Sequence, residues 1–117
     1  MIRLPTSIYV ATSPVDLRCS FDRLAGIVRE QLGGDPAAGA LFVFHNRTRT
    51  HAKMLWRERT GYRILYTRLD RGTYRIPRAL RADDRSVVIS LRELLEWLDG
   101  IDFVVVREAR RGTPRIS

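Results

Sequence analysis

The sequence predicts a single α+β domain, with an antiparallel β-meander of about four to five strands and two helices packed on it. The chain has 117 residues, which is enough for one hydrophobic core and too few for two. Segments that alternate apolar and polar residues fill its middle, and a segment with helical spacing lies on either side of them. We expect residues 1–106 to form the domain and residues 107–117 to be a basic, flexible tail.

The first part of the chain predicts a strand followed by a helix. Residues 7–11 have the β-branched and aromatic content of a short strand. Ser13 is the expected N-cap of the helix, with Pro14 at its first position and Asp16 facing the exposed N–H groups. Gly33 is expected to end it. The apolar stripe of this helix consists of Leu17, Phe21, Leu24, Ile27, Val28 and Leu32.

The middle of the chain predicts four strands. Residues 41–44 are apolar on both faces, which is typical of a central strand. Residues 52–57, 62–68 and 73–76 are amphipathic, so alternate side chains should face a core while several arginines face outward. The side chains expected in the core are Met54, Trp56, Ile64, Tyr66, Tyr74 and Ile76.

The last part of the chain predicts a charged connector, a short helix and an edge strand. Residues 77–85 form the irregular connector. Ser90 and Glu93 have the spacing of a capping box, and leucines at 91, 94, 95 and 98 give the helix its apolar stripe. Gly100 should end this helix, and residues 101–106 are expected to add a strand at an edge of the sheet.

The composition indicates a cytoplasmic protein. Cys19 is the single cysteine and cannot form an internal disulfide. No apolar run approaches the roughly 20 residues that span a bilayer, and the first residues do not resemble a signal peptide. We therefore expect no membrane association, and nothing in the sequence indicates a cofactor.

The positive charge of the chain is concentrated in residues 45–81. This segment holds ten arginines and Lys53 against Glu58 and Asp70, whereas the remaining residues carry ten basic and eleven acidic side chains. A compact basic surface attracts polyanions, of which nucleic acid is the most abundant. We expect phosphate contacts from the projecting turn at residues 46–50 and its neighbours. The candidate DNA-binding residues are Arg47, Arg49, Lys53, Arg57, Arg59, Arg68, Arg71 and Arg75.

Catalytic and metal sites find little support in the sequence. The carboxylates are scattered over caps and turns, and Asp22 is expected to pair with Arg18 on the first helix. His45 and His51 have no convincing third and fourth metal ligands, and we interpret both as partly exposed turn residues. The rings interleaved with arginines could stack on single-stranded bases or pack in the core, and core packing is favoured; they are Trp56, Tyr62, Tyr66 and Tyr74.

Several short segments carry a resemblance to a known family. They are Pro14-Val15-Asp16-Leu17-Arg18 with Phe21-Asp22, Leu41-Phe42-Val43-Phe44 with Asn46-Arg47, Lys53-Met54-Leu55-Trp56, Gly61-Tyr62, Tyr66-Thr67-Arg68-Leu69 with Gly72, and Leu94-Leu95 with Gly100-Ile101-Asp102. In this order and spacing they resemble the TnpB accessory proteins of the IS66 family of bacterial insertion sequences, over residues 5–102. Those proteins are unrelated to the RNA-guided nuclease that shares the name TnpB.

The resemblance implies a role in transposition but does not indicate how the protein performs it. Such proteins are encoded beside a separate DDE-type transposase and support transposition, and the resemblance brings no catalytic residue set. Residues 56–59 and the tail beyond Asp102 depart from the family pattern, so their charge is expected to be a property of this copy. The resulting hypothesis is a non-catalytic accessory protein that binds duplex DNA through phosphate contacts of the basic hairpins and supports the element's separate transposase. The alternatives are a small toxin-type ribonuclease of α+β fold and a protein adaptor whose basic face meets an acidic partner.

Overall fold

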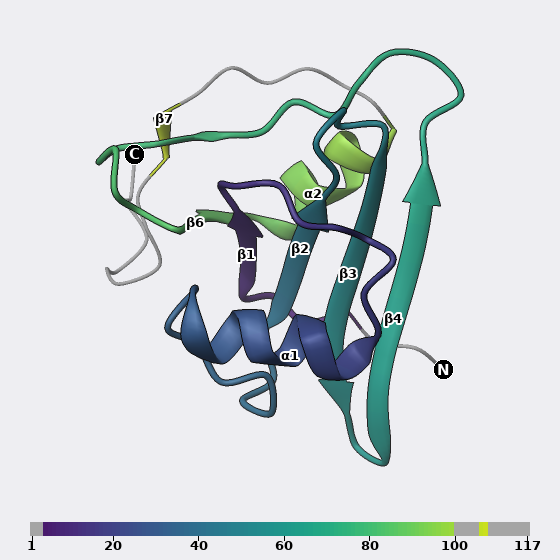
Figure 1. The fold of residues 1–117 in the computed structure, drawn as a ribbon, viewed down its shortest axis with the longest axis vertical. Coiled ribbons are helices and arrows are strands. Elements are labelled where there is room, and N and C mark those ends of the chain that lie inside the picture. The colour runs from purple at the N-terminus through teal and green to yellow at the C-terminus, as the bar shows by residue number, and fades with distance from the viewer. Residues whose placement is uncertain (1–3, 100–105, 108–117) are drawn as a thin grey trace.

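The computed structural model describes residues 4–99 and 106–107, and it confirms an α+β domain (Figure 1). Five strands form one sheet in the order β4-β3-β2-β1-β6, and β5 and β7 form a separate pair. The helices and strands are β1 Ile8–Ala11, α1 Phe21–Glu30, β2 Leu41–His45, β3 His51–Glu58, β4 Gly61–Arg68, β5 Arg78–Ala79, β6 Ser86–Ile89, α2 Leu91–Leu98 and β7 Val106–Arg107.

The sheet is mixed, although the sequence predicts an antiparallel meander. β2, β3 and β4 are antiparallel neighbours, as expected, and β6 pairs antiparallel with β1. β1 and β2 run parallel, with Ile8 opposite Leu41. The reason is that α1 lies between these two strands in the chain and returns it to the starting edge, so β2 can begin beside the start of β1.

The domain has three layers, with one helix on each face of the sheet. Figure 1 shows α1 lying across the front of the sheet and α2 behind it. All five residues of β2 are buried, which confirms the prediction of a central strand. Phe42 and Phe44 pack toward α1, whereas Leu41 and Val43 pack toward α2. We call the hydrophobic cluster between the sheet and α1 the α1 core, and the cluster between the sheet and α2 the α2 core. The buried strand β2 contributes to both cores.

The first helix begins later than predicted. α1 starts at Phe21, with Ser20 at its N-cap, and Ser13 caps no helix. The N–H of Val15 instead donates to the carbonyl of His45 at 2.9 Å, which ties the segment after β1 to the end of β2. Leu17 still packs in the α1 core, and Gly33, at φ +68°, follows the end of the helix as expected.

Residues 73–76 do not form the predicted strand. The N–H of Tyr74 donates to the carbonyl of Arg49 at 2.6 Å, and the Trp97 Nε1–H donates to the carbonyl of Arg75 at 2.6 Å. The Tyr74 ring stacks on Trp97 with centroids 4.2 Å apart. This backbone is therefore bonded to a turn and to α2, not to the sheet.

Two of the six side chains predicted to face the core are exposed. Met54, Trp56 and Tyr74 are buried and Ile76 packs against the α2 core, but Ile64 and Tyr66 are 41% and 56% exposed. β4 is the edge strand of the sheet, and the start of α1 covers only its beginning, where Phe21 lies 4.4 Å from Tyr62 between ring centroids. Among the residues that the structure describes, no helix covers the rest of β4 on that face.

β6 follows the connector and was not predicted. Ser86–Ile89 pairs with β1, and the connector itself contains the two-residue strand β5. Of the predicted edge strand at residues 101–106, the structure describes Val106 alone, in β7. Gly100, which was expected to end α2, and the greater part of the predicted tail also lie outside the described residues.

The capping box of α2 is present as predicted. The Ser90 hydroxyl accepts from the Glu93 N–H at 3.1 Å, and the Glu93 carboxylate accepts from the Ser90 N–H at 2.9 Å. We expect Ser90→Ala to lower the free energy of unfolding by about 0.5 to 2 kcal/mol. Ser13→Ala is the matched control and should change it by less than about 0.5 kcal/mol, because Ser13 is exposed and caps nothing. Equal melting curves for the two variants would contradict this assignment.

Candidate functional site

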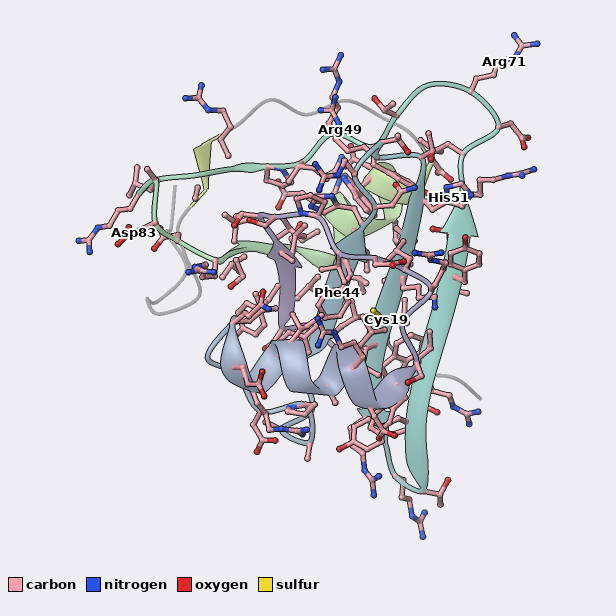
Figure 2. All side chains as sticks on the ribbon, viewed as in Figure 1. Cys19, Phe44, Arg49, His51, Arg71 and Asp83 are labelled. Atoms are coloured by element: carbon pink, nitrogen blue, oxygen red, sulfur yellow. The ribbon has the colours of Figure 1, made fainter. Side chains whose placement is uncertain are left out.

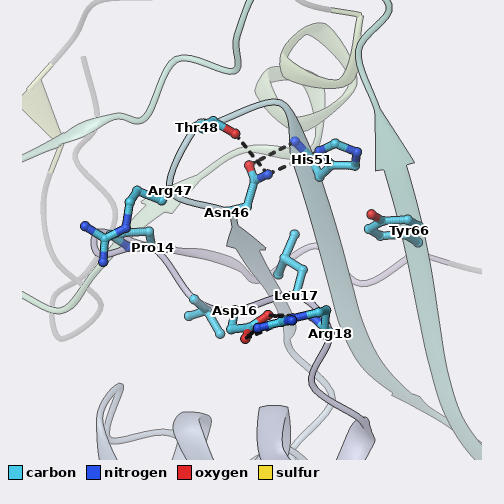
Figure 3. A pocket seen from close by; sticks show the side chains of 10 residues that line it. Pro14, Asp16, Leu17, Arg18, Asn46, Arg47, Thr48, His51 and Tyr66 are labelled. Atoms are coloured by element: carbon cyan, nitrogen blue, oxygen red, sulfur yellow. Dashed lines mark hydrogen bonds and ion pairs between the residues drawn. The ribbon is translucent and has the colours of Figure 1, made fainter.

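A rigid turn joins β2 to β3 at one end of the sheet. The Asn46 side-chain oxygen accepts from the N–H groups of Thr50 and His51 at 2.9 and 3.1 Å. Its amide nitrogen donates to the hydroxyl of Thr48 at 3.1 Å, as Figure 3 shows. The same nitrogen donates to the hydroxyl of Thr50 at 3.2 Å. Arg49 takes the left-handed backbone conformation, with φ at 59°. The Asn46 side chain thus fixes a turn whose tip would otherwise be free to move.

Five predicted DNA-binding residues gather around this turn. Arg47 and Arg49 are exposed within it, and Arg68 lies opposite His51, the first residue of β3. Figure 2 shows Arg49 and Arg71 projecting from the same end of the molecule. Arg75 follows Tyr74, whose N–H is bonded to Arg49. We call this set the basic end, and it comprises Arg47, Arg49, Arg68, Arg71 and Arg75.

The other three predicted residues lie along β3 and in the turn that follows it. The Lys53 ammonium donates to the carbonyl of Cys19 at 3.0 Å and lies 5.4 Å from the Tyr66 ring centroid. Arg57 lies 5.0 Å from the Tyr62 ring centroid. Arg59 is in the turn between β3 and β4, and the eight residues of β3, at about 3.3 Å each, place it roughly 25 Å from the basic end. The basic residues of segment 45–81 are therefore close in sequence but lie at both ends of β3 in the structure.

A hollow of about 530 Å³ lies beside the basic end, between the turn and the segment that links β1 to α1. Figure 3 shows the side chains around it. It is lined by Pro14, Val15, Asp16, Leu17, Arg18, Asn46, Arg47, Thr48, His51 and Tyr66. Most of these residues were not predicted as a site. The sequence analysis assigned residues 14–18 to the start of the first helix and to the family resemblance, and nothing local indicated that this segment would meet the turn.

An ion pair holds one side of the hollow. Arg18 donates from Nε and Nη2 to the two Asp16 carboxylate oxygens, at 3.1 and 2.8 Å, so it does not pair with Asp22 as predicted. The hydrogen bonds from the Arg18 side chain and N–H lower the pKa of Asp16 to about 2, and the same pair raises the pKa of Arg18. Asp16 is therefore ionised at neutral pH, and its charge is matched within the pair.

His45 is buried beneath the turn, contrary to the prediction of an exposed turn residue. Its side chain is 2% exposed, with Nε2 3.0 Å from the Ala11 carbonyl and Nδ1 3.3 Å from the Asn46 carbonyl. Burial lowers the pKa of His45 below its usual 6.5, and the charge of Arg49 acts in the same direction. The imidazole is thus neutral at pH 7 and donates to only one of the two carbonyls.

Mild acid should destabilise the fold through His45. The unfolded chain binds a proton to this imidazole more readily than the folded one does, so stability falls as the pH drops below 6.5 and stops falling below the folded pKa. We expect the melting temperature to fall between pH 7.5 and 5.5, and to fall less in His45→Gln. Parallel decreases in the two proteins would show that His45 does not contribute.

The described part of the chain holds neither a metal-binding cluster nor a membrane-spanning helix. No group of three or more His, Cys, Asp or Glu side chains lies close enough to hold a metal ion within residues 4–99 and 106–107. Over the same residues, no helix is long and apolar enough to cross a membrane.

The chain belongs to the IS66 Orf2-like family of insertion-sequence proteins. Residues 6–108 match the family described as IS66 Orf2 like protein. The chain is also 36% identical over 106 residues to the uncharacterized protein y4hO of Sinorhizobium fredii, which covers 91% of this chain and 90% of that protein. No solved structure matches this chain. The resemblance carried by the short segments is therefore confirmed, and it associates the protein with transposition.

Proposed function

We propose that this protein is a non-catalytic accessory factor of transposition that binds duplex DNA through the basic end and supports the element's transposase in the bacterial cytoplasm. Membership of the IS66 Orf2-like family supports the role in transposition. The gathering of five arginines around one rigid turn supports DNA as the ligand. The proposal depends on this observation.

The basic end suits phosphate better than the opposite end of the sheet does. At the far end Glu58 accepts from Arg63 at 2.6 Å and from the Trp56 Nε1–H at 3.3 Å, which places a carboxylate among Arg57, Arg59 and Arg63. At the basic end, Arg47, Arg49 and Arg71 are exposed on a turn and a loop, and Asp70 is the one acid of the segment there.

A rigid turn adds to the binding energy of these arginines. Arginine presents a planar fork of donors that matches two phosphate oxygens. The hydrogen bonds of Asn46 hold the backbone of the turn in one conformation, so less conformational entropy is lost when Arg47 and Arg49 meet a phosphate. Contacts of this kind set affinity and position and read little sequence.

A transposition assay tests the accessory role. In cells carrying a marked element of this family, we expect Arg47→Ala with Arg49→Ala to lower the transposition frequency. The exposed pair on α1, Arg23→Ala with Arg29→Ala, should leave it near the parent's value. Full transposition with the Arg47 and Arg49 variant would contradict a role for the basic end.

Incubation with nucleic acid tests the absence of catalysis. Purified protein should leave both DNA and RNA intact, and its induction should not arrest growth. Cleavage of RNA, with growth arrest, would favour a toxin-type ribonuclease instead. Salt-dependent binding to the transposase with no affinity for DNA would favour an adaptor.

A further inference from the structure

The hollow beside the basic end combines an exposed aromatic ring with arginine side chains. Tyr66 is 56% exposed although it lies within the sheet strand β4. Its ring stacks beside His51, with centroids 5.7 Å apart and planes inclined by 21°. Lys53 lies directly opposite in the sheet and reaches the same ring. A large ring in this position is held by its neighbours and still offers most of its surface to a ligand.

The opposite side of the hollow carries donors for an anion. Arg47 is exposed at the rim, beside Thr48, whose hydroxyl is already hydrogen-bonded to Asn46 and Thr50 within the turn. Arg18 uses two of its five N–H groups on the Asp16 carboxylate, which also lines the hollow and offsets the Arg18 charge. The pair fixes the guanidinium, whose other N–H groups remain available as hydrogen-bond donors. The Tyr66 ring, Arg47 and the remaining Arg18 donors therefore line one space of about 530 Å³, a volume within the range of about 300 to 1,000 Å³ that is typical of small-ligand sites.

A ligand with a flat ring beside a phosphate fits this arrangement. Duplex DNA supplies the phosphate but hides the faces of its bases in the stack, whereas an unpaired nucleotide offers both. We propose that the hollow binds an unpaired nucleotide of a DNA strand, with its base on Tyr66 and its phosphate on Arg47 and Arg18. This inference rests on the proposed DNA binding by the basic end and extends it to strand ends or opened duplex.

The test compares three labelled DNAs of one sequence by fluorescence anisotropy: a blunt duplex, a duplex with a single-stranded overhang, and a single strand. We expect the overhang to raise the affinity above that of the blunt duplex by about fivefold to 150-fold for each stacked base. Tyr66→Ala should abolish this preference and leave blunt-duplex binding unchanged, whereas Tyr66→Phe should retain it. Melting curves check the fold of both variants, since Tyr66 is exposed.

The outcomes separate this inference from the proposed function. Salt-dependent duplex binding with no gain from the overhang, or an overhang preference that survives Tyr66→Ala, would overturn the inference and leave the proposed function standing. Failure to bind any of the three DNAs would overturn both. Thymidine monophosphate serves as the free-nucleotide probe and should bind weakly, because it cannot reach Arg68 and Arg71 outside the hollow. Tight binding of that nucleotide without strand preference would show that the site takes a free nucleotide and would overturn the assignment to DNA.

Discussion

Replacement of Trp56 by alanine is expected to lower the free energy of unfolding by about 3 to 5 kcal/mol. Trp56 is 4% exposed in the α2 core and lies opposite Leu41 in the sheet. Its removal would leave a cavity that the rigid strands β2 and β3 cannot close. Chemical denaturation measured at one pH and salt concentration gives the change directly.

Tyr66→Ala is the matched control for the Trp56→Ala substitution. The sequence predicts both rings in the core, but Tyr66 is 56% exposed on the edge strand. Tyr66→Ala should change the free energy of unfolding by less than about 1 kcal/mol, which is close to the usual effect of a surface substitution. If the two variants were equally destabilised, the placement of Tyr66 outside the core would be wrong.

Replacement of Arg47 and Arg49 by alanine should weaken duplex DNA binding by about thirtyfold to 150-fold at low salt. This range takes about 1 to 1.5 kcal/mol for each charge-assisted contact to phosphate. The loss should be nearly the same for all DNA sequences, because phosphates carry no sequence information. The melting temperature should hardly change, since both side chains are exposed.

The pair Arg23→Ala with Arg29→Ala controls for net charge. Both residues are exposed on α1, and their removal lowers the charge of the protein by the same amount. We expect this variant to bind duplex DNA nearly as tightly as the parent does. If the Arg23 and Arg29 variant lost DNA binding while the Arg47 and Arg49 variant bound like the parent, the DNA-contacting surface would be α1 and not the basic end.

The sequence correctly predicted the elements that depend on residues close together in the chain. The capping box of Ser90 and Glu93 depends on residues three apart, and the buried strand β2 is apolar at four consecutive positions, so both were found. The start of α1 was misplaced because Ser13 and Pro14 are an equally good local signal. The alternative start at Ser20 is favoured by the bond between Val15 and His45, which are thirty residues apart.

The remaining differences also depend on contacts that are distant in sequence. Residues 73–76 alternate like a strand, but Tyr74 is bound to Arg49 and stacks on Trp97. Alternation assigns Tyr66 to a face of the sheet and cannot show whether a helix covers that face. The charged segment was found from composition, whereas its division between the two ends of β3 follows from the hairpin that β3 and β4 form.

The salt dependence of duplex DNA binding tests the central claim, that the basic end binds phosphates. Five arginines gather at this end, and we expect about four to seven phosphate contacts, so the logarithm of affinity should fall linearly with the logarithm of salt concentration with a slope of about −4 to −6. In the Arg47 and Arg49 variant the slope should be shallower by about two. An affinity that does not change between low and physiological salt would contradict phosphate binding by this protein.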